Sequence, residues 1–340
     1  MVISESEMLG EHGVVQDGYV PVIDLSAAAD PVGRASLART IDEVCRRSGF
    51  LVIVGHGIDP DLVDRMHDTS LAFFELPSEV KRRSTPGGDE ASIRGFIDAP
   101  SYVAASEVET APDLCEMYTS NRLGEPGVAK PEVLGDDYAS YGSPNIWPAE
   151  DLPGFQPVWE EYYAALEGLA EEMMRLFALA LELPEDFFAD KIDDHMTNLV
   201  ANYYPPLAAE PLPGQWRKGP HSDWGTLTIL HQDESGLQVY DRDGDQWLDV
   251  PVVEDAFVVN IGDLMEIWTN DRWRSTKHRV PAPTGEAATV TRVSIPFFHQ
   301  PNWDALVECL PSCLEPGEDP RHPPVYSGPY ILERVRLAYT

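Results

Sequence analysis

His221 and Asp223 are the residues whose types and spacing most clearly suggest chemistry in this sequence. They lie in the segment HSDWG, residues 221–225, with a single serine between them. On an extended strand, residues i and i+2 point to the same face, so an imidazole and a carboxylate would emerge side by side. Such a pair is either part of a metal site that needs a third ligand or two polar side chains on a solvated face.

Among the nine histidines, His278 in the segment STKHRV is the candidate for the third ligand. It stands 55 positions after Asp223, which lets the chain leave the sheet, turn and return beside the first strand. Two histidines and one carboxylate suit non-haem Fe(II), because they leave coordination positions open for a cosubstrate and O2. A zinc hydrolase could use the same ligands, but the sequence offers no obvious general base for it.

A candidate carboxylate site lies 14 residues after His278, in the segment RVS. Arg292 and Ser294 share one face of a strand there, and an arginine fork beside a hydroxyl is suited to holding a carboxylate. Upstream, the segment NYYP places Asn202 and Tyr204 on one face of another strand. A surface salt bridge of Arg292 and simple packing of Tyr204 are the alternatives.

The elements that must position these residues follow from hydrophobic periodicity and turn signals. The first part of the chain predicts an order of strand, helix, strand, helix, at 19–26, 31–49, 50–57 and 59–77. A loop-rich stretch at about 81–150 precedes a long helix at 158–184. After about residue 195, short alternating runs divided by turns indicate a β-sandwich or barrel, closed by a C-terminal helix.

Composition and net charge indicate the class of protein and exclude some kinds of binding partner. The chain has 340 residues, 43% of them apolar, and a net charge of −34, which repels phosphate backbones and anionic membranes. We therefore expect no nucleic-acid partner and no membrane partner. The sequence shows no signal peptide and no apolar run long enough to span a membrane. With four scattered cysteines, we expect free thiols and a cytoplasmic location.

Several motifs together resemble the Fe(II)- and 2-oxoglutarate-dependent oxygenases of the isopenicillin N synthase-like group. The N-terminal part of the resemblance rests on VPVIDLS, SGFLVIVGHGI, FFELPSEVKRRS, RGF and PDLCEMY. The catalytic part rests on NYYPP, HSDWGTLTIL, GLQVY, VVNIGDLMEIWTND, STKHRV and RVSIPFF. Cys115 stands where a lysine is frequent in that family. The resemblance covers most of the chain and is more specific than any single motif.

The resemblance implies a mainly β fold with helices (α+β), whose core is a double-stranded β-helix, or jelly roll. A helical N-terminal region and packing helices would surround this core. The expected organisation is a disordered tail at 1–17, an N-terminal oxygenase region at 18–125, a loop and long scaffold helix at 126–190, a jelly-roll catalytic core at 191–315 and a C-terminal helix at 316–340.

The resemblance also implies roles for individual residues and the cofactors that they would bind. His221, Asp223 and His278 would be the catalytic iron ligands. Arg292 and Ser294, assisted by Tyr204 and Asn202, would bind the distal carboxylate of the cosubstrate 2-oxoglutarate. The segments that line the active-site mouth in the family contribute the expected substrate contacts Arg94, Phe96, Tyr118 and Phe298. Fe(II), 2-oxoglutarate and O2 are the implied reactants, with ascorbate as a stimulating reductant.

The implied activity is oxidation of a small organic molecule with release of succinate and CO2. Hydroxylation is the expected outcome, and desaturation or ring closure is the variant that a second hydrogen abstraction would give. Halogenation is not expected, because related halogenases replace the carboxylate ligand and Asp223 is present. Two alternatives stay open: a 2-oxoglutarate-independent Fe(II) oxidase that performs oxidative cyclisation, and a catalytically silent binding protein. No obligate protein partner is evident, and the substrate and pathway are not specified.

Overall fold

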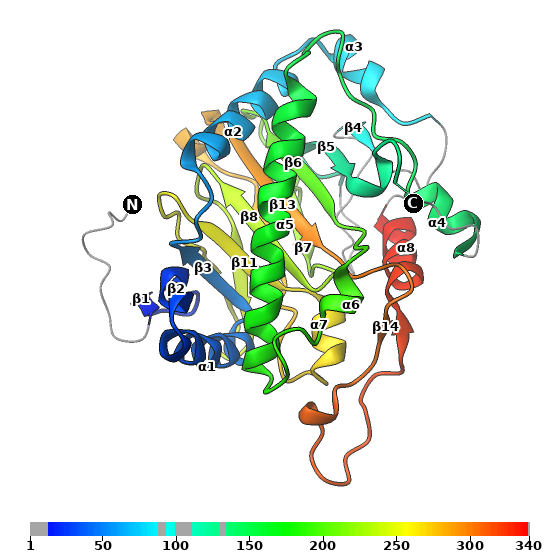
Figure 1. Cartoon of the computed structure of the whole chain (residues 1–340). Coiled ribbons are helices and arrows are strands. Elements are labelled where there is room, and N and C mark those ends of the chain that lie inside the picture. The colour runs from blue at the N-terminus through cyan, green and yellow to red at the C-terminus, as the bar shows by residue number, and fades with distance from the viewer. Residues whose placement is uncertain (1–12, 88–92, 99–110, 129–133, 339–340) are drawn as a thin grey trace.

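The computed structural model describes residues 13–87, 93–98, 111–128 and 134–338. Two β-sheets face each other at its centre, and long helices cover the outer face of the larger sheet (Figure 1). The larger sheet has nine strands in the order β1 (Val14–Gln16), β2 (Val22–Asp24), β3 (Phe50–Val54), β11 (Phe257–Ile261), β8 (Leu227–Gln232), β13 (Arg292–His299), β6 (Asn198–Tyr204), β5 (Glu116–Asn121) and β4 (Gly95–Ile97).

The smaller sheet and one additional strand pair complete the β structure. The four strands of the smaller sheet are ordered β10 (Gln246–Asp249), β9 (Gln238–Asp241), β12 (His278–Pro281) and β7 (Trp216–His221). The separate pair joins β14 (Leu306–Val307) to β15 (Val325–Tyr326). All strand pairings are antiparallel except that of β2 with β3. The expected mainly β jelly roll with helices is therefore confirmed.

The helices lie around this β core. Their bounds are α1 (Pro31–Arg47), α2 (Pro60–Phe74), α3 (Ser78–Lys81), α4 (Gly135–Tyr141), α5 (Phe155–Ala180), α6 (Ala189–Ile192), α7 (Asp263–Trp268) and α8 (Ser327–Ala338). Both α1 and α2 begin with an aspartate cap and a proline: Asp30 accepts hydrogen bonds from two backbone N–H groups, and Asp59 from one. Such start signals predicted α2 from the sequence, whereas α1 was predicted from its apolar stripe.

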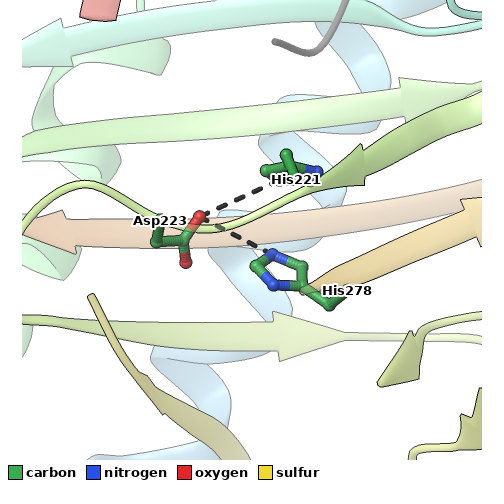
Figure 2. A group of neighbouring side chains, drawn as sticks. All are labelled: His221, Asp223 and His278. Carbon is green, nitrogen blue, oxygen red and sulfur yellow. Dashed lines mark ion pairs between the residues drawn. The ribbon is translucent and has the colours of Figure 1, made fainter. Parts of the chain in front are cut away.

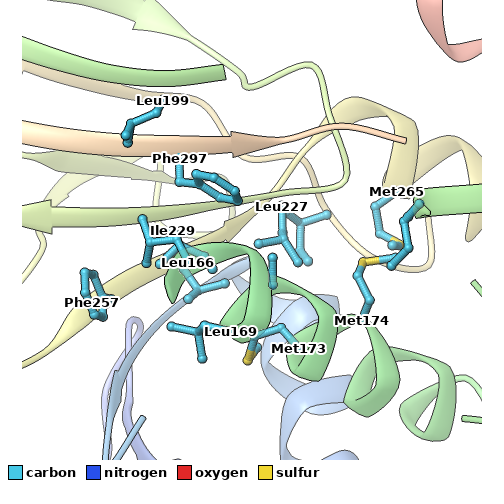
Figure 3. Close-up of a cluster of buried hydrophobic side chains, with 14 of the residues drawn as sticks. Leu166, Leu169, Met173, Met174, Leu199, Leu227, Ile229, Phe257, Met265 and Phe297 are labelled. Atoms are coloured by element: carbon cyan, nitrogen blue, oxygen red, sulfur yellow. The ribbon is translucent and has the colours of Figure 1, made fainter. Parts of the chain in front are cut away.

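The outer core lies between the larger sheet and the helices. Leu166, Leu169 and Met173 on α5 are buried against the sheet, where Ile229 of β8 and Phe297 of β13 face them (Figure 3). Burying each such side chain contributes about 1.5–3 kcal/mol of hydrophobic free energy. This face therefore fixes the orientation of the strands whose other face carries the polar residues. Within the described ranges, no helix is both long enough and apolar enough to cross a membrane.

The inner core lies between the two sheets. Val52 of β3 and Val258 of β11 project from the larger sheet, and Val239 of β9 and Val280 of β12 belong to the smaller one. Their cluster fills one part of the space between the sheets. Polar residues and cavities occupy another part, which is described below.

Three sequence-based expectations about local structure need correction. The loop-rich stretch at 81–150 contains β4, β5 and α4, whose short lengths gave weak periodic signals. The tail expected to be disordered through residue 17 includes β1, where Val14 pairs with Ile23, while residues 1–12 lie outside the described part. The C-terminal helix begins only at Ser327, after the short strand β15.

Candidate metal centre and active-site cavities

The paired ends of β7 and β12 bring two histidines together. His221 is the last residue of β7, His278 is the first of β12, and the two are direct partners in the antiparallel pair. Their ring centroids are 4.3 Å apart. Asp223 lies beyond the end of β7, in the loop that leads to β8, so the expectation that it shares a strand with His221 is wrong.

The loop nevertheless brings the Asp223 carboxylate to both imidazoles. Its Oδ1 atom lies 3.8 Å from Nε2 of His221 and 3.6 Å from Nε2 of His278 (Figure 2). One ligand atom from each of the three residues falls within 4.8 Å of the others. Among the residues that the structure describes, this is the one group of three or more His, Cys, Asp or Glu side chains that converges in this way.

Gly225 explains how the loop can turn so tightly beside β13. A Cβ atom at this position would lie only 2.2 Å from the backbone oxygen of His299. The loop is held there by Thr226, whose backbone N–H donates to His299, and by Asp263, whose N–H donates to the backbone oxygen of Asp223 at 2.8 Å. The glycine in HSDWG therefore permits the close approach that places the carboxylate.

Hydrogen bonds on the far side of each imidazole orient the two rings. The Nδ1 atom of His221 lies 2.8 Å from the carbonyl oxygen of Gly219, and that of His278 lies 3.2 Å from the carbonyl oxygen of Thr276. A carbonyl only accepts, so each Nδ1 carries the proton and donates it. This leaves the lone pair on each Nε2, which faces Asp223, and such partners typically support metal-binding histidines.

The Asp223 carboxylate is oriented in the same way. Its Oδ2 atom accepts hydrogen bonds from the Thr228 hydroxyl at 2.6 Å and from the Asn260 side-chain amide at 2.7 Å. Oδ1 is the oxygen that remains directed at the histidines. Burial opposes the charge, but the two histidines and these hydrogen bonds together hold the pKa of this carboxyl below its ordinary value. The residue is therefore an anionic ligand at neutral pH.

The electrostatics of the cluster suit a divalent cation. Burial, together with the neighbouring His278, lowers the pKa of His221 to about 3, so its imidazole is neutral at physiological pH. The cluster thus offers two imidazole nitrogens and one carboxylate oxygen. This donor set fits a facial Fe(II) site, because nitrogen and oxygen ligands on one side leave the opposite positions open.

The predicted carboxylate site lies across the β13–β6 pair. Arg292 is the direct partner of Tyr204, and Ser294 is the direct partner of Asn202. The guanidinium lies 5.1 Å from the centroid of the Tyr204 ring. Burial raises the pKa of Tyr204 to about 12, so its hydroxyl is neutral. The side-chain amide of Asn202 donates to the Ser294 hydroxyl at 3.4 Å.

Arg292 is buried with one nitrogen unused. Its Nε donates to the backbone oxygen of Glu234 and its Nη2 to Oε1 of Gln232, both at 3.1 Å. Its Nη1 is buried and has no hydrogen-bond partner among the described residues. A buried guanidinium with a free donor is costly unless an anion pairs with it, so this atom fits a carboxylate ligand.

Two cavities meet at the three-residue cluster. The first, here called the arginine cavity, connects the cluster to the carboxylate site and is lined by residues that include His278, Arg292, Ser294, Tyr204 and Thr228. The second, here called the apolar cavity, is lined by residues that include Ile93, Ile97, Met117, Thr119, Val200, Trp224, Gln300 and Val335. Both cavities are lined by Asn202, Lys218, His221, Asp223 and Phe298.

Of the four residues expected to contact substrate, the structure places one at the cavities. Phe298 lines both. Phe96 and Tyr118 point to the opposite face of the sheet, where their rings pack on Phe73 with centroids 5.8 Å and 4.8 Å apart. Arg94 is also buried outside the cavity linings, and it donates to the backbone oxygen of Ile93 at 2.8 Å. The expectation that these three line the active-site mouth is wrong.

Sequence reasoning missed the neighbours that do line the apolar cavity. Ile97 of β4 and the β5 residues Met117 and Thr119 face it, each one position away from an expected residue. Because side chains alternate between the two faces of a strand, a residue facing the cavity has neighbours that face the helix-covered core. An assignment that is wrong by one residue therefore names a core side chain in place of a cavity side chain. Lys218 was missed as well, because on a regular strand it would face away from His221; the irregular pairing of β7 with β12 accompanies the placement of both side chains at the cavities.

Family comparisons agree with this geometry. Residues 196–301 match the model of the 2OG-Fe(II) oxygenase superfamily. Residues 20–150 match the model described as non-haem dioxygenase in morphine synthesis N-terminal. The first range holds the metal cluster and the candidate carboxylate site.

Individual relatives cover almost the whole chain. A 2-oxoglutarate-Fe(II) type oxidoreductase, hxnY, of Emericella nidulans is 36% identical over 94% of this chain and 89% of its own length. Validamycin A dioxygenase of Streptomyces hygroscopicus subsp. limoneus is 34% identical over 93% of this chain and 86% of its own length.

A solved structure shows the same fold. A full-length Neurospora crassa protein in complex with alpha-KG, which is 2-oxoglutarate, superposes with a TM-score of 0.82 at 31% identity, covering 98% of this chain and 99% of that one. The cosubstrate in that complex and the oxidoreductase relatives agree with the activity that the sequence motifs implied. The chain belongs to the 2OG-Fe(II) oxygenase superfamily and is a non-haem dioxygenase that uses Fe(II) and 2-oxoglutarate.

Proposed function

We propose that this dioxygenase hydroxylates a small molecule held in the apolar cavity, with His221, Asp223 and His278 as the iron ligands. The observation that carries the proposal is the convergence of three oriented ligand atoms within 4.8 Å at a point where two cavities meet. Iron bound there would supply activation of O2 beside the substrate. The protein positions the target C–H bond and, by burying the cluster, limits access of water.

We assign the distal carboxylate of 2-oxoglutarate to the arginine cavity. The buried and unpartnered Nη1 of Arg292 supports this assignment, because a guanidinium pairs well with a carboxylate. Ser294 and Tyr204 would add hydroxyl donors. Asn202 would act mainly through Ser294, to which it donates.

The alternative of a 2-oxoglutarate-independent oxidase is not favoured. The relatives are 2-oxoglutarate-Fe(II) oxidoreductases, and the Neurospora crassa structure contains alpha-KG. Ring closure or desaturation by the same 2-oxoglutarate-dependent enzyme is the variant that a product analysis distinguishes.

Relatives suggest the first substrates to test. The Neurospora crassa protein has also been crystallised with alpha-KG and thymine, and that structure has a TM-score of 0.81 at 29% identity. Another relative, 30% identical, is a homoarginine-6-hydroxylase of Oryza sativa subsp. japonica. Validamycin A, the compound named for a third relative, differs from these in size, and we propose only that the substrate of the present enzyme is a polar small molecule.

We also propose that the enzyme works in the cytoplasm without a nucleic-acid, membrane or obligate protein partner. A net charge of −34 opposes binding to phosphate backbones and anionic lipid surfaces. All four cysteines are free thiols, which agrees with a reducing compartment.

The test is a product analysis under ¹⁸O2. The purified enzyme with Fe(II) and 2-oxoglutarate is incubated with thymine, homoarginine, validamycin A and a wider panel of small metabolites. The proposal expects succinate formation in step with a product that has gained one ¹⁸O atom. A product that has lost two hydrogens without gaining oxygen would indicate desaturation or ring closure instead. Product formation that does not require 2-oxoglutarate would contradict the assignment.

A further inference from the structure

Building on the proposed function, we infer that Gln300 binds a carbonyl or carboxylate oxygen of the substrate in the apolar cavity, and that Thr119, which lines the same cavity, offers a second polar contact; the two residues are here called the polar wall. Both side chains line the cavity, and both are buried, with exposed fractions of 4% for Gln300 and 3% for Thr119. Neither residue was indicated by the sequence motifs. They deepen the proposed function by naming the chemical group that the cavity selects.

A relay of hydrogen bonds fixes the direction in which the Gln300 amide points. Arg94 can only donate, and its Nη1 lies 3.4 Å from Oδ1 of Asn198, which also accepts from Asn121 at 3.1 Å. The amide nitrogen of Asn198 therefore faces Tyr141 and donates to its hydroxyl at 2.6 Å. The Tyr141 hydroxyl then donates onward, and Oε1 of Gln300 at 2.8 Å is its nearer acceptor, since the backbone oxygen of Met196 lies at 3.4 Å.

The relay leaves the amide nitrogen of Gln300 for a ligand. Because Oε1 is held by Tyr141, the Nε2 group with its two N–H donors is turned away from Tyr141, and it makes no hydrogen bond to a described residue. The Gln300 side chain packs close to Gly225, which lies two residues after the metal ligand Asp223. An oxygen bound by Gln300 would thus be held near the metal centre.

Thr119 adds a second unused group to the same wall. Its hydroxyl is buried and has no hydrogen-bond partner among the described residues. A buried hydroxyl without a partner destabilises the free protein, whereas a ligand oxygen would satisfy it. The Thr119 hydroxyl can donate or accept, so the selection of an acceptor oxygen rests on the amide N–H groups of Gln300, and Thr119 adds a second group that can donate to such a ligand.

The remaining wall specifies the rest of the ligand. Ile97, Met117, Val200 and Phe298 give the cavity an apolar surface, while Lys218 and Asn202 add polar groups on the side that it shares with the arginine cavity. The structure therefore favours a small molecule with an acceptor oxygen on one side and an aliphatic or ring portion that carries the reacting C–H bond.

The experiment uses matched pairs of small ring compounds as probes. One member of each pair carries a lactam, ketone or carboxylate oxygen, and the other has a methylene or methyl group in its place. Binding is measured under anaerobic conditions as a change in the visible absorption of the full-length enzyme with Fe(II) and 2-oxoglutarate. The oxygen-bearing members are expected to bind roughly tenfold to a hundredfold more tightly.

Variants then test whether Gln300, held in orientation by Tyr141, causes this preference for oxygen-bearing probes. Gln300→Leu should remove most of the preference, and Tyr141→Phe should reduce it several-fold because the amide is no longer held in one orientation. Gln246→Leu, at an exposed position of β10, is the matched control and should change nothing. The affinity for 2-oxoglutarate should stay the same in all three variants.

Thr119→Val separates a binding role from a structural one. It should leave the melting temperature unchanged or raise it, since it removes an unsatisfied buried hydroxyl, while it weakens the oxygen-bearing probes several-fold. If the absorption band forms but oxygen-bearing probes bind no better than their partners, the polar wall does not recognise an acceptor. If the band does not form in the wild-type enzyme, the proposed function itself fails.

Discussion

Two clusters in this molecule contain the same residue types but only one converges on a point. The first is His221, Asp223 and His278. The second, here called the rear cluster, is His67 on α2 with His231 and Asp233, and it lines a separate cavity with residues 252–257. Composition alone would make both candidates for a metal site.

In the rear cluster, His67 and Asp233 already form hydrogen bonds with each other or with the backbone. Nε2 of His67 lies 3.1 Å from Oδ2 of Asp233, and both carboxylate oxygens of Asp233 accept from the backbone N–H of Val293 at 3.0 Å. The rings of His67 and His231 are 6.5 Å apart and roughly perpendicular. Burial, with His67 nearby, lowers the pKa of His231 to about 4, so that ring is neutral.

The comparison shows that the partners around a cluster decide its chemistry. At the first cluster, backbone carbonyls and the Thr228 and Asn260 side chains bind the outward atoms and leave three inward atoms free. At the rear cluster, the carboxylate instead anchors the start of β13, next to Arg292. The rear cluster therefore supports the cosubstrate site structurally: Nδ1 of His231 has no partner among the described residues, but only the first cluster has three ligand atoms that converge.

The largest effect is expected from His278→Ala. Loss of one of three ligands should abolish Fe(II) binding and reduce turnover below detection. Iron content and succinate formation are the measurements. His231→Ala is the matched control and should keep both properties. Equal losses in the two variants would remove the distinction between the clusters.

Arg292→Ala should raise the KM for 2-oxoglutarate by about 30-fold or more, because truncating one side of a buried charge pair costs roughly 2 kcal/mol or more. Steady-state kinetics with varied 2-oxoglutarate measure the change. Arg279→Ala is the control, since this arginine lies over the Trp247 ring and lines neither cavity. An unchanged KM in Arg292→Ala would place the cosubstrate carboxylate elsewhere.

Thr228→Val tests the outward partners of the metal cluster. It removes the hydrogen bond of 2.6 Å to Oδ2 of Asp223 and keeps the side-chain shape. Loss of such a supporting contact typically costs about 10–100-fold in metal affinity. Anaerobic titration with Fe(II) measures this loss, and an affinity equal to that of the wild type would show that Asn260 alone orients the carboxylate.

The smallest effect concerns the pH dependence of the rear cluster. The hydrogen bond to Asp233 outweighs burial and raises the pKa of His67. A raised folded-state pKa gives stability that is complete below the unfolded value of about 6.5 and is lost as the pH rises through the folded value. We expect His67→Gln to remove this contribution, about 1 kcal/mol or less, from the unfolding free energy at pH 6 but hardly at pH 9. An equal loss of unfolding free energy at pH 6 and at pH 9 would show that the His67–Asp233 ion pair does not contribute.

The sequence predicted the elements with strong signals and the residues inside motifs. The helices α1, α2 and α5 and a β-sandwich or barrel follow from local periodicity and turn residues, whereas the jelly roll itself was implied by the family resemblance. The three converging residues were also predicted, because H-x-D and a later histidine become specific once Arg292, Ser294 and the other family motifs are added. Arg292 and Ser294 followed from their shared strand face and lie opposite Tyr204 and Asn202, as the strand pairing requires.

The substrate wall was not predictable in the same way. Which face of β5 meets the cavity depends on the helix that covers the other face, and Tyr118 packs there on Trp159 of α5 at 4.9 Å. The choice between Tyr118 and its neighbours Met117 and Thr119 is therefore made by tertiary packing. The orientation of Gln300 likewise depends on Arg94 and Tyr141, which are distant from it in the sequence.

The most direct test of the central claim is an anaerobic absorption titration. Fe(II) and then 2-oxoglutarate are added to the metal-free enzyme, and the metal-to-ligand charge-transfer band is followed in the visible range. The account predicts that the band forms in the wild type and in His231→Ala and does not form in His221→Ala. A band that persists in His221→Ala, or a wild-type enzyme that binds iron and forms no band with 2-oxoglutarate, would contradict it.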